Sequence, residues 1–213
     1  MAEIIASGDC WTFDSDGLLD IFYEGNMPNF YYSYSRVPWY EQRPQIQTVI
    51  MRNGLTRIGD YAFYGCSNLT AVTIPDGVSS VGESAFSGCF SLYAVTLPDS
   101  VTSIGPGAFS GCSSLTSISI PDGVTSIEIR VFSGCSGLTS IDMPESVTSI
   151  KAYAFSDCNS LTSIKIPSSV ISIEENAFEN CSSLTSIIGY NGSYAESWAG
   201  EQGYTFIPYD GQE

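Results

Sequence analysis

The chain has 213 residues, of which 43% are hydrophobic and 14% charged, so burying a core presents no difficulty. Asp and Glu number 23 against 7 Lys and Arg, and the net charge of −16 disfavours nucleic acid and anionic lipid, which both need a basic face. Histidine, the most frequent general base and a common zinc ligand, is absent. We therefore expect neither an enzyme nor a bound cofactor.

Membrane and export signals are not visible in the sequence. No apolar run approaches the roughly 20 residues that cross a bilayer, so we expect no direct membrane insertion. Residues 1–5 lack the basic start and apolar stretch of a signal peptide. The compartment therefore has to be inferred from other features.

Residues 1–42 are predicted to form an N-terminal cap. The turn at residues 14–17, Asp-Ser-Asp-Gly, divides an alternating stretch over 10–24, a pattern typical of a β-hairpin. An aromatic cluster follows at Phe30, Tyr31, Tyr32, Tyr34, Trp39 and Tyr40. Such rings can bind sugars or quaternary ammonium groups, but covering the open end of the first repeat is the simpler interpretation.

Residues 43–190 form a repeat of 23 residues. Six of the seven cysteines recur at this interval, at Cys66, Cys89, Cys112, Cys135, Cys158 and Cys181. A phenylalanine column keeps the same register, at Phe63, Phe86, Phe109, Phe132, Phe155 and Phe178. A fixed period of this length indicates a solenoid, in which each unit buries its apolar side chains only against its neighbours.

One unit, residues 69–89, shows what each coil is expected to contain. Val72 and Ile74 alternate with polar residues, which predicts a short strand ended by Pro75. Residues 78–81 form a second extended piece. Residues 82–89 are predicted to hold one or two helical turns, with a glycine placed to cap their end.

The unit Leu-x-x-Val-x-Ile-Pro-Asp-Gly-Val-x-Ser-Ile-Gly-x-x-Ala-Phe-x-Gly-Cys resembles the BspA-like (type 5) leucine-rich repeat. That family is known from secreted and surface proteins of host-associated bacteria. The resemblance implies an α/β solenoid, a right-handed superhelix with a parallel β-sheet of about seven short strands. Short helical or 3-10 turns would lie on the opposite side, and a β-hairpin would form the N-terminal cap.

Residues 191–213 are predicted to form the C-terminal cap of what is one continuous domain. The stretch 189–196 resembles the usual ending of the family. Residues 195–199 are expected to form a short helix that covers the last repeat with Trp198.

The cysteine column is the first candidate for chemistry. Neighbouring cysteines would stack at about 5 Å, within the Cα range of a disulfide, but side chains in a ladder point parallel rather than toward each other. No Cys-x-x-Cys spacing or histidine completes a metal site. We therefore interpret these residues as buried free thiols, and Cys10 as unpaired.

An acidic column follows the prolines at Asp76, Asp99, Asp122 and Glu145. Stacked carboxylates could share a Ca²⁺ ion, so calcium is one candidate ligand of this column. Turn chemistry accounts for the same residues. A carboxylate pair for glycoside hydrolysis needs similar separations, but repetition in every unit is the opposite of a unique catalytic site.

Departures from the repeat are the more informative candidates for ligand binding. Phe90 and Tyr93 place two rings at the entrance of one strand, where other units have Ser or Asn and Thr. Asp142 and Lys165 put opposite charges on adjacent coils, and Arg130 breaks the pattern on the helical side. Drift within a tolerant repeat remains the alternative.

These features predict a secreted or cell-surface recognition module that binds a protein or glycan through the concave sheet face and its rims. A structural spacer within a larger surface protein is the alternative, and a carboxylate-based hydrolase is a distant third. The surface location rests on the family resemblance. Six aligned thiols without a disulfide framework are unusual for an oxidising exterior unless they are buried.

Overall fold

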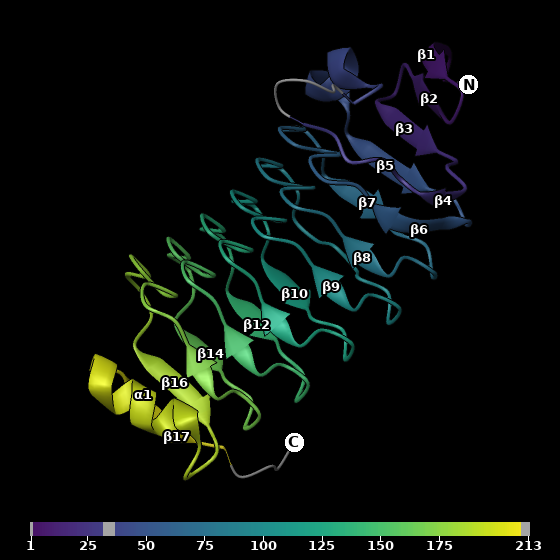
Figure 1. Ribbon diagram of the computed structural model, residues 1–213. Coiled ribbons are helices and arrows are strands. Elements are labelled where there is room, and N and C mark those ends of the chain that lie inside the picture. The colour runs from purple at the N-terminus through teal and green to yellow at the C-terminus, as the bar shows by residue number, and fades with distance from the viewer. Residues whose placement is uncertain (1, 32–36, 210–213) are drawn as a thin grey trace.

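The computed structural model describes residues 2–31 and 37–209, and these wind into a solenoid whose coils stack from the N-terminal to the C-terminal end (Figure 1). Each coil presents two short extended segments and one row of turns. The coils are related by the 23-residue period, as shown by the pairing of Ser117 with Ser140 and of Ser149 with Ser172. This confirms the predicted solenoid of parallel strands.

The first row of strands forms one side of the solenoid, here called the strand face (Figure 1). Its members are β5 (Thr48–Met51), β7 (Ala71–Thr73), β10 (Ser117–Ser119), β12 (Ser140–Asp142), β14 (Ser163–Lys165) and β16 (Ser186–Gly189). Their central side chains are directed to the core, and their first and third side chains face outward. The corresponding residues of the third coil, 94–96, form no strand, so the row is interrupted directly after Tyr93.

A second row of shorter strands lies on the adjacent side (Figure 1). It comprises β4 (Gly25–Asn26), β6 (Leu55–Ile58), β8 (Ser80–Val81), β9 (Ser103–Ile104), β11 (Ser126–Ile127), β13 (Ser149–Ile150) and β15 (Ser172–Ile173). The pairs within it are parallel. These strands match the second extended piece that the repeat predicts.

The third side, here called the turn row, corrects the expectation of helical turns. In the first coil, alternate backbone N–H groups donate within the coil and to the next coil. Tyr64 N donates to Tyr61 O at 3.2 Å, whereas Phe63 N donates to Ala85 O at 2.7 Å. The alternation requires a left-handed backbone at Tyr61 (φ 58°) and Gly65 (φ 71°). A helix would keep all of these bonds within one coil, so isolated turns form instead.

The N-terminal residues form the predicted hairpin. β1 (Ile4–Gly8), β2 (Trp11–Asp14) and β3 (Leu18–Ile21) are antiparallel neighbours, and β3 then pairs in parallel with β5. A 3-10 helix over Tyr40–Gln45 leads into the first coil. Of the aromatic cluster, Tyr32 and Tyr34 lie outside the described residues, and Phe30 and Trp39 are buried in the core.

The C-terminal residues contain α1 (Tyr194–Gln202), longer than the expected 195–199, and a strand that the sequence did not predict. This strand, β17 (Thr205–Pro208), pairs in parallel with β16 and extends the first row by one member. Helix and strand together cover the last coil (Figure 1).

The core is continuous along the whole solenoid. Phenylalanine rings at the 23-residue interval stack with centroid separations between 5.1 and 5.9 Å, from Phe63 to Phe178. Trp39 stacks on the first ring at 5.7 Å, and Trp198 meets the last at 5.4 Å. No coil can therefore exclude water alone, as expected for a repeat protein.

Candidate binding surface

The outward positions of the strand face carry mostly small side chains, and threonines directly precede the strands at its entrance, where several are engaged within the fold. Thr70 Oγ1 donates to Gln47 O at 3.0 Å, and Thr139 Oγ1 donates to Thr116 O at the same distance. These hydroxyls bond the backbone of the preceding coil. The consensus residues thus help to stack the coils, which leaves the departures from consensus as candidates for recognition.

Phe90 and Tyr93 project from the third coil into solvent. Their side chains are 54% and 57% exposed, respectively. Their backbone carbonyls still accept hydrogen bonds from the next coil, from Ser114 N at 3.1 Å and Thr116 N at 3.3 Å. The backbone therefore stacks as in other coils, while two rings occupy positions that elsewhere hold small polar side chains.

The three charged candidates lie elsewhere. Asp142 accepts a hydrogen bond from Ser119 Oγ at 3.4 Å at the exit of the strand face. Lys165 occupies the same position one coil further on, and its ammonium lies 3.6 Å from the centroid of the Tyr209 ring. Arg130 belongs to the turn row. The structure therefore groups Phe90 with Tyr93 and places Asp142 and Lys165 in one column, but it does not unite all five residues in one site.

Arg130 itself stacks along the turn row. Its guanidinium lies 4.7 Å above the centroid of the Tyr153 ring, one coil further on. The backbone at Arg130 is left-handed (φ 58°), as it is at the other described members of its column. This contact accounts for the side chain within the fold without a ligand.

The acidic column lies at the turns that follow the strand face. Asp99, Asp122 and Asp142 border a shallow hollow of about 220 Å³. Glu145 is engaged in the fold, because Ser168 Oγ donates to its Oε2 at 2.8 Å. Within residues 2–31 and 37–209, no three His, Cys, Asp or Glu side chains are arranged to hold a metal ion. Turn chemistry accounts for this column.

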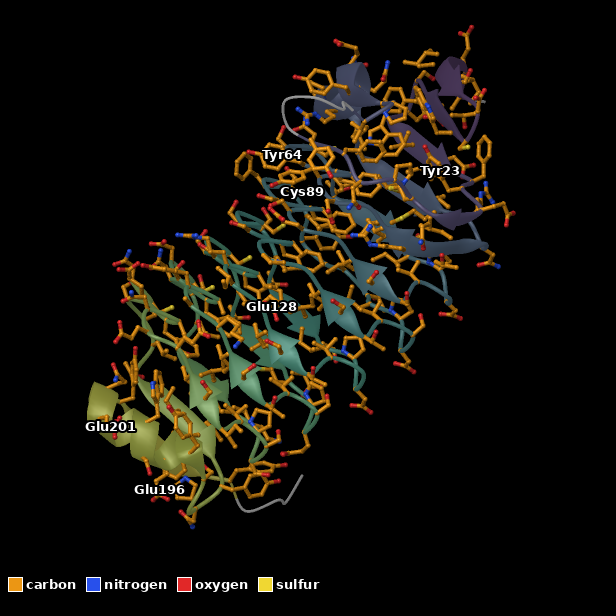
Figure 2. All side chains as sticks on the ribbon, in the orientation of Figure 1. Tyr23, Tyr64, Cys89, Glu128, Glu196 and Glu201 are labelled. Atoms are coloured by element: carbon orange, nitrogen blue, oxygen red, sulfur yellow. The ribbon has the colours of Figure 1, made fainter. Side chains whose placement is uncertain are left out.

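The six thiols of the cysteine column are buried, and five of them have a hydrogen-bonding role that the sequence did not reveal. Cys89 Sγ donates to Phe63 O at 3.3 Å, and the bond repeats along the column at Cys112, Cys135, Cys158 and Cys181. Cys89 is marked in Figure 2. Burial raises the pKa of Cys66 and of Cys135 to about 12. Such thiols are unreactive, because the thiolate is the nucleophile.

A larger hollow, which sequence reasoning missed, lies between the N-terminal hairpin and the entrance of the first three coils. Its volume is about 440 Å³, within the range of ligand pockets of about 300 to 1,000 Å³. Its lining residues are Phe13, Asp14, Ser15, Gly17, Pro44, Gln45, Gln47, Asn68, Thr70 and Ser91. We call it the entrance hollow. Glutamines at 45 and 47, in register with Asn68 and Thr70, were the available sequence signal.

A further hollow, of about 580 Å³, lies at the C-terminal end beside α1. Four glutamates line it, Glu174, Glu175, Glu179 and Glu201, and Glu201 projects from α1 in Figure 2. Glu174 is already engaged, since it accepts from Ala152 N at 2.9 Å and pairs with Lys151 at 3.2 Å. Its concentration of carboxylates makes this hollow less suited than the entrance hollow to an uncharged ligand.

The sequence matches the BspA type leucine rich repeat region in six copies, over residues 39–159 and 109–195. A solved leucine rich cell surface protein from Faecalibacterium prausnitzii is 30% identical, with a TM-score of 0.68, over 89% of this chain and 54% of that one. The T. pallidum leucine rich repeat protein is 24% identical, with a TM-score of 0.62, over 92% of this chain and 94% of that one. The chain thus spans about half the length of the Faecalibacterium protein. No curated protein matches the sequence.

Proposed function

The chain belongs to the BspA-type leucine-rich-repeat family, and from this premise we propose that it is a secreted or cell-surface recognition module. It binds a protein or glycan through the strand face and the rims beside it. The family and this fold are generally non-enzymatic, which agrees with the expectation of no catalytic role. Along residues 2–31 and 37–209, no helix is long and apolar enough to cross a bilayer.

The observation that carries this proposal is the exposure of Phe90 and Tyr93 in columns of small polar residues. Large rings held in water on a rigid scaffold are typical anchors of interfaces, because a partner buries them at little entropic cost. Acidic side chains gather at the exit turns and at the C-terminal end. The net charge of −16 further favours neutral or basic partners.

The test restores the repeat at both positions with the double variant Phe90→Ser and Tyr93→Thr. Arrays of extracellular proteins and glycans identify a ligand of the unmodified chain, and titration then compares the affinities. We expect the double variant to bind at least about tenfold more weakly, with an unchanged melting temperature. Unchanged affinity would contradict the proposal.

A matched control is available at Ile171, which at 73% is the most exposed large apolar side chain of the part of the chain that the structure describes. It directly precedes β15 of the second row, and Thr102, Thr125 and Thr148 occupy its column in earlier coils. Ile171→Thr also restores the repeat and removes apolar surface, but away from the strand face. We expect this variant to retain full binding.

A structural spacer is the second candidate, and the unbroken stack of rings from Trp39 to Trp198 favours it. Such a stack makes the solenoid stiff along its length. The chain's coverage of about half of its Faecalibacterium relative is compatible with a segment of a larger protein. If the arrays yield no ligand of any class, the spacer role is the better explanation.

A further inference from the structure

The departures from the repeat at the entrance of the strand face are concentrated in the first three coils. One column reads Gln47, Thr70 and Tyr93, and then threonine at every later coil. A second begins with Gln45, and a third contains Phe90. These residues lie around or beside the entrance hollow. Gln45, Gln47 and Thr70 line it, and so does Ser91, which lies between Phe90 and Tyr93 in the chain. The large side chains among the entrance departures thus lie at or beside one hollow.

From this arrangement we propose that the entrance hollow binds an uncharged, hydroxyl-rich glycan chain, whose sugar rings continue over Tyr93 and Phe90. The proposal rests on the recognition function proposed above and gives it a site and a ligand class. Sugar hydroxyls would meet the polar wall of the hollow. The apolar faces of the sugar rings would lie against the two exposed aromatic rings of the third coil.

Asp14 supplies the strongest acceptor in the hollow. Its side chain is only 8% exposed, although it carries a carboxylate. One oxygen, Oδ1, accepts from Asp16 N at 3.0 Å and from Leu18 N at 2.9 Å. Both side-chain hydrogen bonds of Asp14 to residues 2–31 and 37–209 end on Oδ1, and none ends on the other oxygen, Oδ2. This oxygen is not among the buried atoms, so it is the accessible part of an otherwise buried side chain and can accept from an outside donor, such as a hydroxyl group.

The opposite wall supplies groups that both donate and accept. The side chains of Gln45, Gln47 and Ser91 form no hydrogen bond with any other described residue. Asn68 differs, because its Nδ2 is held by Pro44 O at 2.7 Å. Amides and hydroxyls each pair with sugar hydroxyls in either direction, so this wall suits a polyol.

The charge distribution favours a neutral glycan over other ligands. An acidic glycan would be repelled by the net charge of −16 and by Asp14 itself. A basic peptide would meet one carboxylate here, whereas three aspartates border the hollow at the exit turns. A peptide that adds a strand needs a free sheet edge, but β3 and β5 are paired with each other at this end.

The dimensions of the site also fit. Two coil steps separate Gln47 from Tyr93, a span of about 10 Å at about 4.8 Å per step. A short oligosaccharide covers that length, with one part in the hollow and the next over the rings. Ser91, which lines the hollow, directly follows Phe90 and lies two residues before Tyr93, so the hollow and the rings are neighbours in the chain.

The experiment is an array of neutral glycans probed with the full chain, followed by calorimetric titration of the strongest neutral oligosaccharide. Asp14→Asn keeps the oxygen that accepts from Asp16 and Leu18 but removes the charge. Asp99→Asn, at an exit turn, is the matched control. We expect Asp14→Asn to weaken binding at least about tenfold, since hydrogen bonds to charged groups are the stronger ones. Asp99→Asn is expected to leave the affinity within about twofold of the unmodified chain.

A second variant tests the same site without changing the hairpin, in case Asp14→Asn impairs folding. Gln45→Ala with Gln47→Ala removes two amides that bond nothing within the described residues, so its melting temperature should not change. Gln202→Ala, on α1 at the far end, is its control. We expect the double variant, but not the control, to lose at least about tenfold in affinity. In ¹⁵N spectra, the side-chain amide signals of Gln45 and Gln47 should shift on titration.

Each contrary result has a distinct meaning. If no neutral glycan binds, or if binding ignores both the Asp14 and the glutamine variants, the glycan site is overturned. A protein ligand that is lost with Phe90→Ser and Tyr93→Thr, yet is indifferent to Asp14→Asn, overturns the site and leaves the recognition function standing. Failure of both arrays overturns both proposals.

Discussion

Trp39 and Trp198 lie at opposite ends of a single stack of six phenylalanine rings. Trp39 packs on Phe63 with ring centroids 5.7 Å apart, and Trp198 packs on Phe178 at 5.4 Å. Trp39 comes from the segment before the first coil and Trp198 from α1 after the last. Each indole covers a ring that would otherwise face water, which is the role expected of the terminal segments of a solenoid.

The two tryptophans differ in one hydrogen bond, which gives the first prediction. Trp39 Nε1 donates to Ala62 O at 3.0 Å, and the residue is fully buried. Trp39→Phe removes this donor and leaves a buried carbonyl short of a partner, so we expect a loss of about 1–3 kcal/mol in the free energy of unfolding. Trp39→Ala should cost about 3–5 kcal/mol, because it also opens a cavity.

Urea unfolding measures both losses. Trp198→Phe is the control, since no hydrogen bond of its indole to a described residue is seen, and it should cost less than Trp39→Phe. Equal losses for the two phenylalanine variants would show that the hydrogen bond to Ala62 contributes nothing.

The buried thiols predict a fall in stability at alkaline pH. Burial raises the pKa of Cys66 and of Cys135 from 9.0 to about 12 in the folded chain. Above pH 9 the unfolded thiols release protons while the folded ones keep them, so the stabilisation present below pH 9 is lost as the pH rises toward about 12. Each thiol contributes a slope of up to about 1.4 kcal/mol per pH unit.

Denaturant unfolding at several pH values between about 8 and 11 measures this slope. Tyrosines and lysines titrate in the same range. The comparison is therefore with Cys66→Ala and Cys135→Ala, which remove one thiol each. We expect a shallower decline in both variants. Parallel curves for the variants and the unmodified chain would refute a thiol contribution.

Thiol labelling should single out Cys10, the one cysteine that is not buried. With an excess of a disulfide reagent near neutral pH, we expect one thiol per folded chain to react quickly. All seven should react once denaturant is added. Peptide mapping identifies the fast site, and Cys10→Ser should abolish the fast phase. Rapid labelling of Cys112 or Cys135 in the folded chain would be inconsistent with the core described above.

The sequence predicts the repeat well because side chains at equivalent positions of the period occupy equivalent environments in the fold. Residues 23 apart lie one above the other, so the columns of Phe63 and Cys66 follow directly from their spacing. The hairpin also follows from local turn chemistry around Asp14. These are features that one coil, or one turn, determines by itself.

The turn row and the entrance hollow could not be predicted in the same way. Residues 82–89 have a composition compatible with helical turns, but alternate N–H groups bond to the next coil, as Phe86 N does to Ala108 O at 2.8 Å. That choice depends on a neighbour rather than on the local sequence. The hollow joins Asp14 of the hairpin to Gln45 and Ser91 of the coils. The hairpin lies outside the repeat, so no periodicity relates these residues.

The close packing of the N-terminal cap against the first coil provides the last prediction. Met27 N donates to Arg57 O at 3.0 Å, and Phe30 N donates to Asp60 O at 2.9 Å. Between these two bonds, a Cβ added to Gly59 would overlap the carbonyl of Pro28. The cap backbone therefore approaches the coil more closely than any larger residue at position 59 permits.

We expect Gly59→Ala to lower the free energy of unfolding by about 2–3 kcal/mol, because the Pro28 segment must move aside. Gly65→Ala is the matched control. Its backbone is left-handed (φ 71°) and nothing lies near its added Cβ, so only the conformational cost of about 1 kcal/mol applies. Hydrogen exchange at the amides of Met27 and Phe30 should accelerate in the Gly59 variant alone. Equal losses of stability with unchanged exchange would mean that the cap is not held by this close approach.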